Sequence, residues 1–224
     1  MKSETVISAL VRERTPVAAV EESRLGVADG AGAVIFDLSE MPRELWTVDA
    51  YRNLVKSVPV PVSFCCYDIS ASERLPPIDA PMVEAAAFGA AYVDVSSASV
   101  AAAKERGAKV IVSEHLLSRS ASFDEAVAIF RRARESGADI AKLVARMDTL
   151  EEFADAKRVM TYLRDEFPVP WIYLGLGTFG FEQRFLGPEY GCAMTFALHR
   201  PFPGKKDQPL IADVVARMKK IYER

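Results

Sequence analysis

The sequence predicts an α/β fold, a (β/α)₈ barrel that occupies residues 1–224 as one domain. Three observations predict it. Eight short runs rich in Val and Ile recur about every 28 residues, amphipathic segments separate most of them, and the runs are apolar on both faces. Strands buried on both faces are typical of parallel sheets, and eight strands alternating with helices is the composition of a closed barrel.

The predicted strands are short. They span residues 5–11, 33–39, 61–67, 92–97, 109–115, 140–145, 171–177 and 192–198. A doubly wound open sheet is the alternative. That fold usually has fewer strands and a glycine-rich turn after the first one, whereas residues 11–16 read Val-Arg-Glu-Arg-Thr-Pro.

The predicted helices show apolar residues at helical spacing, most clearly in residues 122–137. Ser122 and Glu125 form the pattern of a capping box at its start, and Gly137 is positioned to end it. Residues 149–167 and 209–224 show the same amphipathic pattern. Each precedes or follows a predicted strand, as the barrel requires.

Composition and charge exclude several classes of protein. Lys plus Arg is 28 against 31 for Asp plus Glu, and the basic residues are scattered, so we expect no nucleic-acid partner. No run of about 18 apolar residues indicates a membrane span, and the first residues are too briefly apolar for a signal peptide, so we expect a cytoplasmic protein. The two histidines, His115 and His199, lack ligands at metal spacing, so we expect no metal, and His199 is interpreted as structural.

Lys142 is the first candidate catalytic residue, because it interrupts the apolar strand 140–145. Burial disfavours the charged form of an amine, which would prepare it to attack a carbonyl. An ion pair with a neighbouring carboxylate such as Asp94 is the alternative. His115 ends the preceding strand, and neighbouring strands lie about 5 Å apart, so both side chains could reach one substrate. A histidine that only binds a loop remains possible.

The glycine-rich segment 175–191 leads from the seventh strand toward the eighth and contains Arg184. An arginine there can bind a carboxylate with two parallel hydrogen bonds. Its glycine spacing does not match the dinucleotide fingerprint, and a surface salt bridge would equally account for Arg184.

Together these residues resemble the type I 3-dehydroquinate dehydratases, Schiff-base enzymes that are (β/α)₈ barrels. The similarity is best over residues 109–198. The family's Ser-aromatic-His motif is similar to Ser113-Glu114-His115, and its Gly-Ala-Asp-Ile lead to the imine-forming lysine is similar to residues 137–142. Its Met-Gly-x-x-Gly-x-x-Ser-Arg loop is similar to residues 176–184, followed by a matching Gly187, Tyr190-Gly191 and Thr195-Phe196.

The first half departs from the family pattern at the positions that, by resemblance, bind the substrate. Asp37 and Ser39 stand where the family has Glu-x-Arg, Cys65 or Cys66 where it has an arginine, and Ser96 where it has a glutamate. The closing-loop Pro-Gly-Gln becomes Pro-Gly-Lys, ending at Lys205. The substitutions predict weaker selection of a polyhydroxylated ring. Arg146, four residues after Lys142, or Lys205 is expected to supply a new anion contact.

The resemblance implies a carbon-oxygen lyase that dehydrates 3-dehydroquinate, or a close keto-acid analogue, through an imine on Lys142. In this prediction His115 moves protons, and Arg184 binds the substrate carboxylate. The imine is its own electron sink, so we expect no cofactor, and the resemblance suggests a homodimer. Two alternatives remain: a Schiff-base aldolase-like lyase acting on another keto acid, and a barrel that binds a ligand but has lost turnover.

Overall fold

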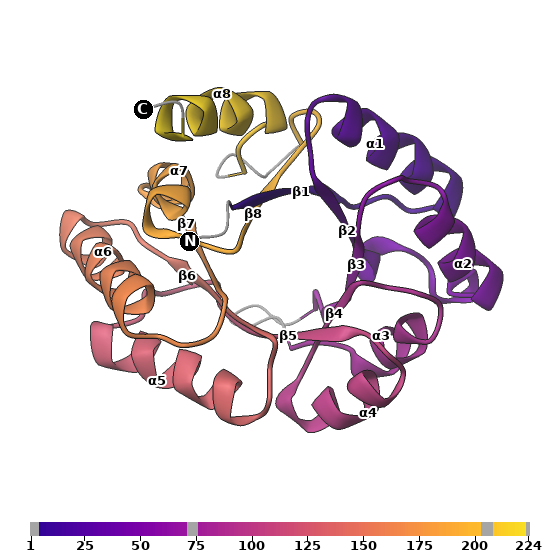
Figure 1. Cartoon of the computed structure of the whole chain (residues 1–224), viewed down its shortest axis with the longest axis horizontal. Coiled ribbons are helices and arrows are strands. Elements are labelled where there is room, and N and C mark those ends of the chain that lie inside the picture. The colour runs from indigo at the N-terminus through magenta and orange to yellow at the C-terminus, as the bar shows by residue number, and fades with distance from the viewer. Residues whose placement is uncertain (1–4, 71–75, 203–207, 223–224) are drawn as a thin grey trace.

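The computed structural model describes residues 5–70, 76–202 and 208–222. Its eight strands are β1 (Val6–Val11), β2 (Ala33–Asp37), β3 (Val62–Cys65), β4 (Tyr92–Val95), β5 (Lys109–Leu116), β6 (Ile140–Arg146), β7 (Trp171–Leu176) and β8 (Met194–Ala197). All eight predicted strands are confirmed. Figure 1 looks along the barrel axis and shows the strands as an inner ring with the helices outside it.

The helices that cover the ring are α1 (Pro16–Ala28), α2 (Val48–Lys56), α3 (Asp79–Ala86), α4 (Val100–Glu105), α5 (Phe123–Glu135), α6 (Leu150–Asp165), α7 (Gly180–Tyr190) and α8 (Ile211–Tyr222). Short 3₁₀ turns, η1 (Leu38–Glu40), η2 (Arg43–Leu45) and η3 (Ser97–Ser99), follow β2 and β4. Helices α1 to α7 return the chain to the N-terminal end of the next strand, so all the paired strands run parallel.

The sheet is a nearly closed barrel. Its strand order is β7-β6-β5-β4-β3-β2-β1-β8, so β1 pairs with both β2 and β8, which excludes the open doubly wound alternative. Within the described residues β7 and β8 form no ladder, although the Ala193 amide donates to the Trp171 carbonyl over 2.8 Å across this seam. The strands are apolar on both faces because helices cover the outside and the interior is packed.

The predicted helix ends are confirmed with one correction. Ser122 accepts a hydrogen bond from the Glu125 amide at the start of α5, and Gly137 follows the helix with a φ of +89°. The capping box predicted there is only half formed, because the Glu125 carboxylate binds the Arg119 guanidinium instead. A complete capping box starts α6, between Thr149 and Glu152.

Candidate active site

Lys142 lies in the barrel interior, in register with Ser113 of β5 and Ile172 of β7. Its side chain is 3% exposed, and its Nζ donates to Asp94 Oδ2 at 3.0 Å and to Tyr67 Oη at 2.9 Å. The same amine lies 5.1 Å from the centre of the Phe196 ring. The ion pair with Asp94 weighed in the sequence is therefore present, and the amine also lines a cavity, so the pairing and a chemical role are compatible.

Asp94 organises the groups around this amine. It is fully buried, and each of its two oxygens accepts hydrogen bonds from different groups. Oδ2 accepts from the Tyr67 hydroxyl at 2.6 Å, and Oδ1 accepts from the Ser113 hydroxyl at 2.7 Å. Burial, reinforced by the Asp94 charge, raises the pKa of Tyr67 well above its ordinary value. The Tyr67 hydroxyl therefore keeps its proton, which it donates to Asp94.

His115 lies two residues after Ser113 and so points to the same interior face. Its ring meets the Tyr67 ring edge-on, with 4.6 Å between centroids. Burial lowers the pKa of His115 well below its ordinary value, and the charges of Lys142, Arg12 and Arg184 lower it further. The imidazole is therefore neutral, and its Nδ1 has no hydrogen-bond partner among the described residues. A neutral ring can accept a proton from a substrate.

The glycine-rich segment places α7 directly against β7. A Cβ on Gly175 would lie 2.7 Å from the Cα of Gly180, so only glycine permits this approach. Gln183 fixes the helix there, because its side chain accepts from the Gly175 amide at 2.6 Å and donates to the Tyr173 carbonyl at 2.9 Å. The close contact explains why this loop is rich in glycine without a dinucleotide fingerprint.

Arg184 is consequently buried rather than on the surface. It is 2% exposed, which excludes the surface salt bridge that the sequence left open. Its Nε donates to the Gly175 carbonyl at 2.9 Å, and its Nη1 donates to Gln208 Oε1 at 3.1 Å. Gln208 lies three residues after Lys205, which the resemblance aligned with the family's glutamine. Sequence reasoning missed Gln208. The presence of a glutamine three residues after Lys205 could have identified it as a partner of Arg184.

Arg12 is a further, largely buried cation, and sequence reasoning missed it. Its Nε donates to Asp37 Oδ2 at 2.8 Å, and its Nη2 also binds this oxygen. Burial opposes the charge of Arg12, but Asp37 outweighs it and raises the pKa of the guanidinium. Asp37 Oδ1 accepts from the Ser39 amide at 3.0 Å, and the Ser39 hydroxyl accepts from the Tyr67 amide at 2.9 Å. Arg12 follows β1 directly, and its position on the face of Leu10 is the signal that was available.

One cavity brings most of these groups together. Its empty volume is about 590 Å³, including the part that is open to solvent. It is lined by Leu10, Arg12, Ile35, Asp37, Cys65, Tyr67, His115, Leu117, Lys142, Val144, Leu174, Leu176, Arg184, Phe196 and Gln208. Burial raises the pKa of the Cys65 thiol well above its ordinary value, so this side chain lines the cavity as an uncharged thiol. Two arginines and a lysine facing one carboxylate favour an anionic ligand.

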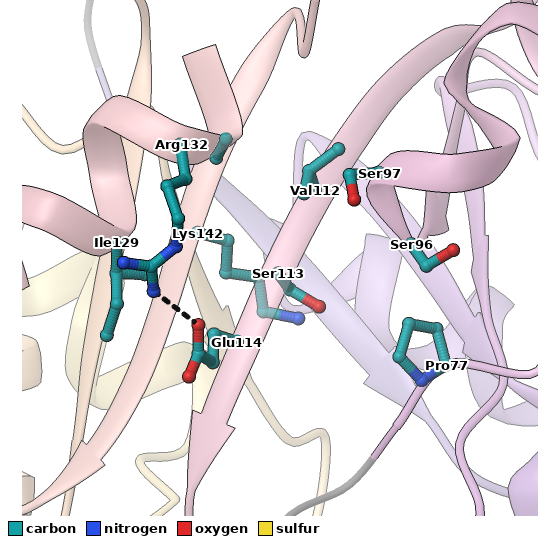
Figure 2. A pocket seen from close by; sticks show the side chains of 10 residues that line it. Pro77, Ser96, Ser97, Val112, Ser113, Glu114, Ile129, Arg132 and Lys142 are labelled. Carbon is teal, nitrogen blue, oxygen red and sulfur yellow. Dashed lines mark hydrogen bonds and ion pairs between the residues drawn. The ribbon is translucent and has the colours of Figure 1, made fainter. Parts of the chain in front are cut away.

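Other predicted site residues lie outside this cavity. Ser96 lines a second pocket, which Ser113 and Lys142 also line. There its amide donates to Asp79 Oδ1 at 2.8 Å, and its hydroxyl binds Asp79 Oδ2. Figure 2 shows this pocket with the Glu114 and Arg132 ion pair, 3.2 Å long, on one side. The Lys142 amine and the Ser113 hydroxyl end close together in the same view.

Arg146 lies beyond the cavity and donates to Asp148 Oδ2 at 2.7 Å with its side chain 42% exposed. Lys205 is outside the described residues. His199 binds Asp29 over 2.6 Å, as expected of a structural histidine. Across the described ranges, no group of three His, Cys, Asp or Glu side chains is placed to hold a metal ion. In the same part of the chain, no helix is long and apolar enough to cross a membrane.

Relatives identified by sequence match less than half of the chain. The dehydratase of Alkaliphilus oremlandii, named 3-dehydroquinate dehydratase, is 35% identical over 98 residues, which are 42% of this chain and 38% of the relative. The protein of the same name from Geobacillus thermodenitrificans is 32% identical over 95 residues, 42% of this chain and 37% of the relative. The matches therefore span less than two fifths of these relatives' lengths.

Solved structures match nearly the whole fold. The 3-dehydroquinate dehydratase of Geobacillus kaustophilus superposes with a TM-score of 0.82 at 20% identity, over 99% of this chain and 93% of that one. The type I enzyme of Clostridium difficile, solved with covalently modified comenic acid, gives 0.87 at 15% identity, over 99% and 94%. At these identities the likeness shows the barrel fold alone.

The family comparison is more specific. The model of the family described as type I 3-dehydroquinase matches residues 67–219, which is more than half of the chain. That range begins at Tyr67 and contains Lys142, His115 and Arg184. It leaves out residues 1–66, which include the departures from the family pattern at Asp37, Ser39 and Cys65. The chain belongs to the type I 3-dehydroquinase family.

Proposed function

We propose that the protein is a type I 3-dehydroquinate dehydratase-like lyase, which removes water from 3-dehydroquinate or a close analogue through an imine on Lys142. One observation carries this proposal. A buried amine, a neutral imidazole and a buried guanidinium, from β6, β5 and α7, line a single cavity. Imine formation, proton transfer and carboxylate binding need those three groups in that arrangement.

The chemistry follows from the geometry. The Lys142 amine attacks the substrate ketone and, with loss of one water, forms the protonated imine, which withdraws electrons from the neighbouring carbon. The neutral His115 takes a proton from that carbon and returns it to the departing hydroxyl, which leaves as a second water. Hydrolysis of the product imine consumes one water and frees Lys142. Arg184 is held by Gly175 and Gln208 in a fixed position, so it can orient the substrate carboxylate without reorganising.

The test is intact-protein mass spectrometry after adding 3-dehydroquinate and borohydride, with product followed by the absorbance of the conjugated enone. We expect one adduct, mapped to Lys142, and enone formation by the untreated protein. Lys104→Met is a matched control. Lys104 is exposed in the last turn of α4, where it pairs with Asp139, and it does not line the cavity. Enone formation by a Lys142→Met variant would refute the proposal.

A second candidate is the same imine chemistry on a less hydroxylated keto acid, including aldolase-like cleavage of a carbon-carbon bond. The Arg12 and Asp37 ion pair favours it, because it occupies the cavity wall where the family resemblance expects Glu-x-Arg. Borohydride adducts with simpler keto acids but not with 3-dehydroquinate would support this candidate. Release of two carbonyl fragments would identify the aldolase reaction.

We also propose that the protein acts as a cytoplasmic homodimer on a small carboxylate substrate. The support is the family resemblance, together with a cavity whose lysine and two arginines suit an anion. Size-exclusion chromatography with light scattering tests the dimer, and the mass of a monomer at micromolar concentration would contradict it.

A further inference from the structure

Imine formation needs proton transfers at nitrogen and oxygen that are separate from the one at carbon. An ammonium must first lose a proton before it attacks a ketone, and the carbinolamine hydroxyl must gain a proton before it leaves as water. His115 is suited to the carbon, because it is neutral and points into the cavity. The described contacts of the Lys142 nitrogen include Tyr67 and Asp94, but no hydrogen bond joins it to His115.

We propose that Tyr67 and Asp94 form a proton shuttle for Lys142, with Tyr67 as an additional catalytic residue of this site. The inference rests on the proposed imine chemistry and adds that Tyr67 and Asp94 move protons at nitrogen and oxygen, whereas His115 moves the proton at carbon. Tyr67 Oη lies 2.9 Å from the reacting nitrogen and 2.6 Å from Asp94 Oδ2, so one hydroxyl joins the amine to the carboxylate. It also lines the cavity beside Lys142, so it can reach the oxygen of a bound carbinolamine.

The proton balance closes with these groups alone. The Lys142 ammonium gives a proton to the Tyr67 oxygen while Tyr67 passes its own proton to Asp94, which leaves a free amine and a neutral carboxyl. The amine attacks the ketone, and the proton on nitrogen moves to the new alkoxide. Asp94 then returns its proton through Tyr67 to the carbinolamine hydroxyl, which departs as water. One ammonium and one ketone become one protonated imine and one water, and both shuttle residues regain their starting state.

Other contacts suit Asp94 to this role. Its second oxygen is held by the Ser113 hydroxyl, so Oδ2 stays aimed at Tyr67 and Lys142. Asp94 is fully buried and Tyr67 is 4% exposed, so both are shielded from bulk solvent. Burial raises the pKa of Tyr67, which keeps its hydroxyl protonated between transfers.

The experiment measures two reactions of Lys142 in the full chain. Pyruvate with cyanoborohydride reports imine formation, which requires loss of water, and cyanate reports attack by the free amine with no loss of water. Both adducts are mapped to Lys142 by peptide mass spectrometry. Tyr67→Phe removes only the hydroxyl, and Tyr51→Phe is its matched control, because the Tyr51 hydroxyl is buried without a hydrogen-bond partner among the described residues.

We expect Tyr67→Phe to slow imine formation about 100-fold or more, in the range of general acid-base catalysis. Carbamylation by cyanate should change less than about threefold, because Asp94 Oδ2 also contacts the Lys142 nitrogen directly at 3.0 Å and can take the first proton without Tyr67. Asp94→Asn, which keeps the shape of the side chain, should slow imine formation similarly. Tyr51→Phe should match the wild type in both reactions. Equal losses in both reactions of Tyr67→Phe would show that Tyr67 only positions Lys142, and imine formation at the wild-type rate would show that it does nothing. Either result overturns the shuttle.

The pyruvate probe separates this inference from the proposed function. If the wild type forms the pyruvate imine and Tyr67→Phe does not, but 3-dehydroquinate gives no enone, the shuttle stands and the proposed substrate fails. If 3-dehydroquinate is dehydrated equally fast by both proteins, the function stands and the shuttle fails. A wild-type Lys142 that forms no imine with either compound would overturn both.

Discussion

Replacing Arg12 with methionine tests whether the ion pair on the cavity wall stabilises the fold. The Asp37 side chain is 1% exposed and that of Arg12 is 15% exposed, so the substitution leaves a carboxylate in the interior without its cation. Breaking a buried pair from one side costs about 3 kcal/mol or more, because the remaining charge is desolvated and uncompensated. For a chain of this length that corresponds to a fall in Tm of about 6–12 °C.

The assay is urea unfolding followed by tryptophan fluorescence, with Arg134→Ala as the control. Arg134 is exposed and lies 3.7 Å from the exposed Glu135, so its loss should change the free energy of unfolding by less than about 0.5 kcal/mol. The double variant Arg12→Met, Asp37→Leu should recover part of the loss. An Arg12→Met variant as stable as Arg134→Ala would refute the reasoning.

Three further changes have defined outcomes. Lys142→Met keeps an apolar stem without the amine and should abolish borohydride trapping and turnover together, with circular dichroism checking the fold; trapping that survives would mean another lysine reacts. His115→Gln should lower kcat about 10²–10⁴-fold. The pKa of His115 is lower in the folded chain than the ordinary 6.5, so the wild-type free energy of unfolding should fall as pH drops below about 6.5. The fall should be steeper than that of His115→Gln. An equal dependence of the two free energies on pH, measured by urea unfolding, would contradict this. Gly175→Ala should cost about 1–3 kcal/mol, since its Cβ would meet backbone, whereas Gly32→Ala, whose nearest neighbour would be 3.7 Å away, should cost less; equal Tm values would show that β7 and α7 move apart freely.

The regular part of the fold was predictable because it depends on local pattern. Every strand was predicted from an apolar run bounded by turn residues, and burial on both faces indicated a parallel sheet. Closure of the ring followed from counting strands. The helix start at Ser122 was right in position but wrong in detail, because Glu125 had a competing partner in Arg119, six residues earlier in a loop.

The second half of the site was similarly predictable, since Lys142 and Arg184 are charged residues within otherwise apolar or glycine-rich segments. Tyr67 and Arg12 were missed for a physical reason. Each lies just beyond a strand end, where a polar residue usually faces solvent, and only the alternation from Cys65 or Leu10 places it inside. The partner of a buried charge also depends on packing between distant strands. Asp37 and Arg12 are 25 residues apart, and no local pattern joins them.

The seam between β7 and β8 has a consequence for how the barrel opens. A cylinder whose ladder is interrupted along one line exchanges its amide hydrogens fastest there, since fewer bonds must break to admit water. Helix α7 spans that line, and Arg184 reaches from it to Gly175 at the end of β7 and to Gln208 beyond β8. A ligand that binds Arg184 and Lys142 at once therefore links α7 to β6 and stabilises the barrel beside the interrupted ladder. Slower deuterium uptake in Trp171–Leu176 would record its binding.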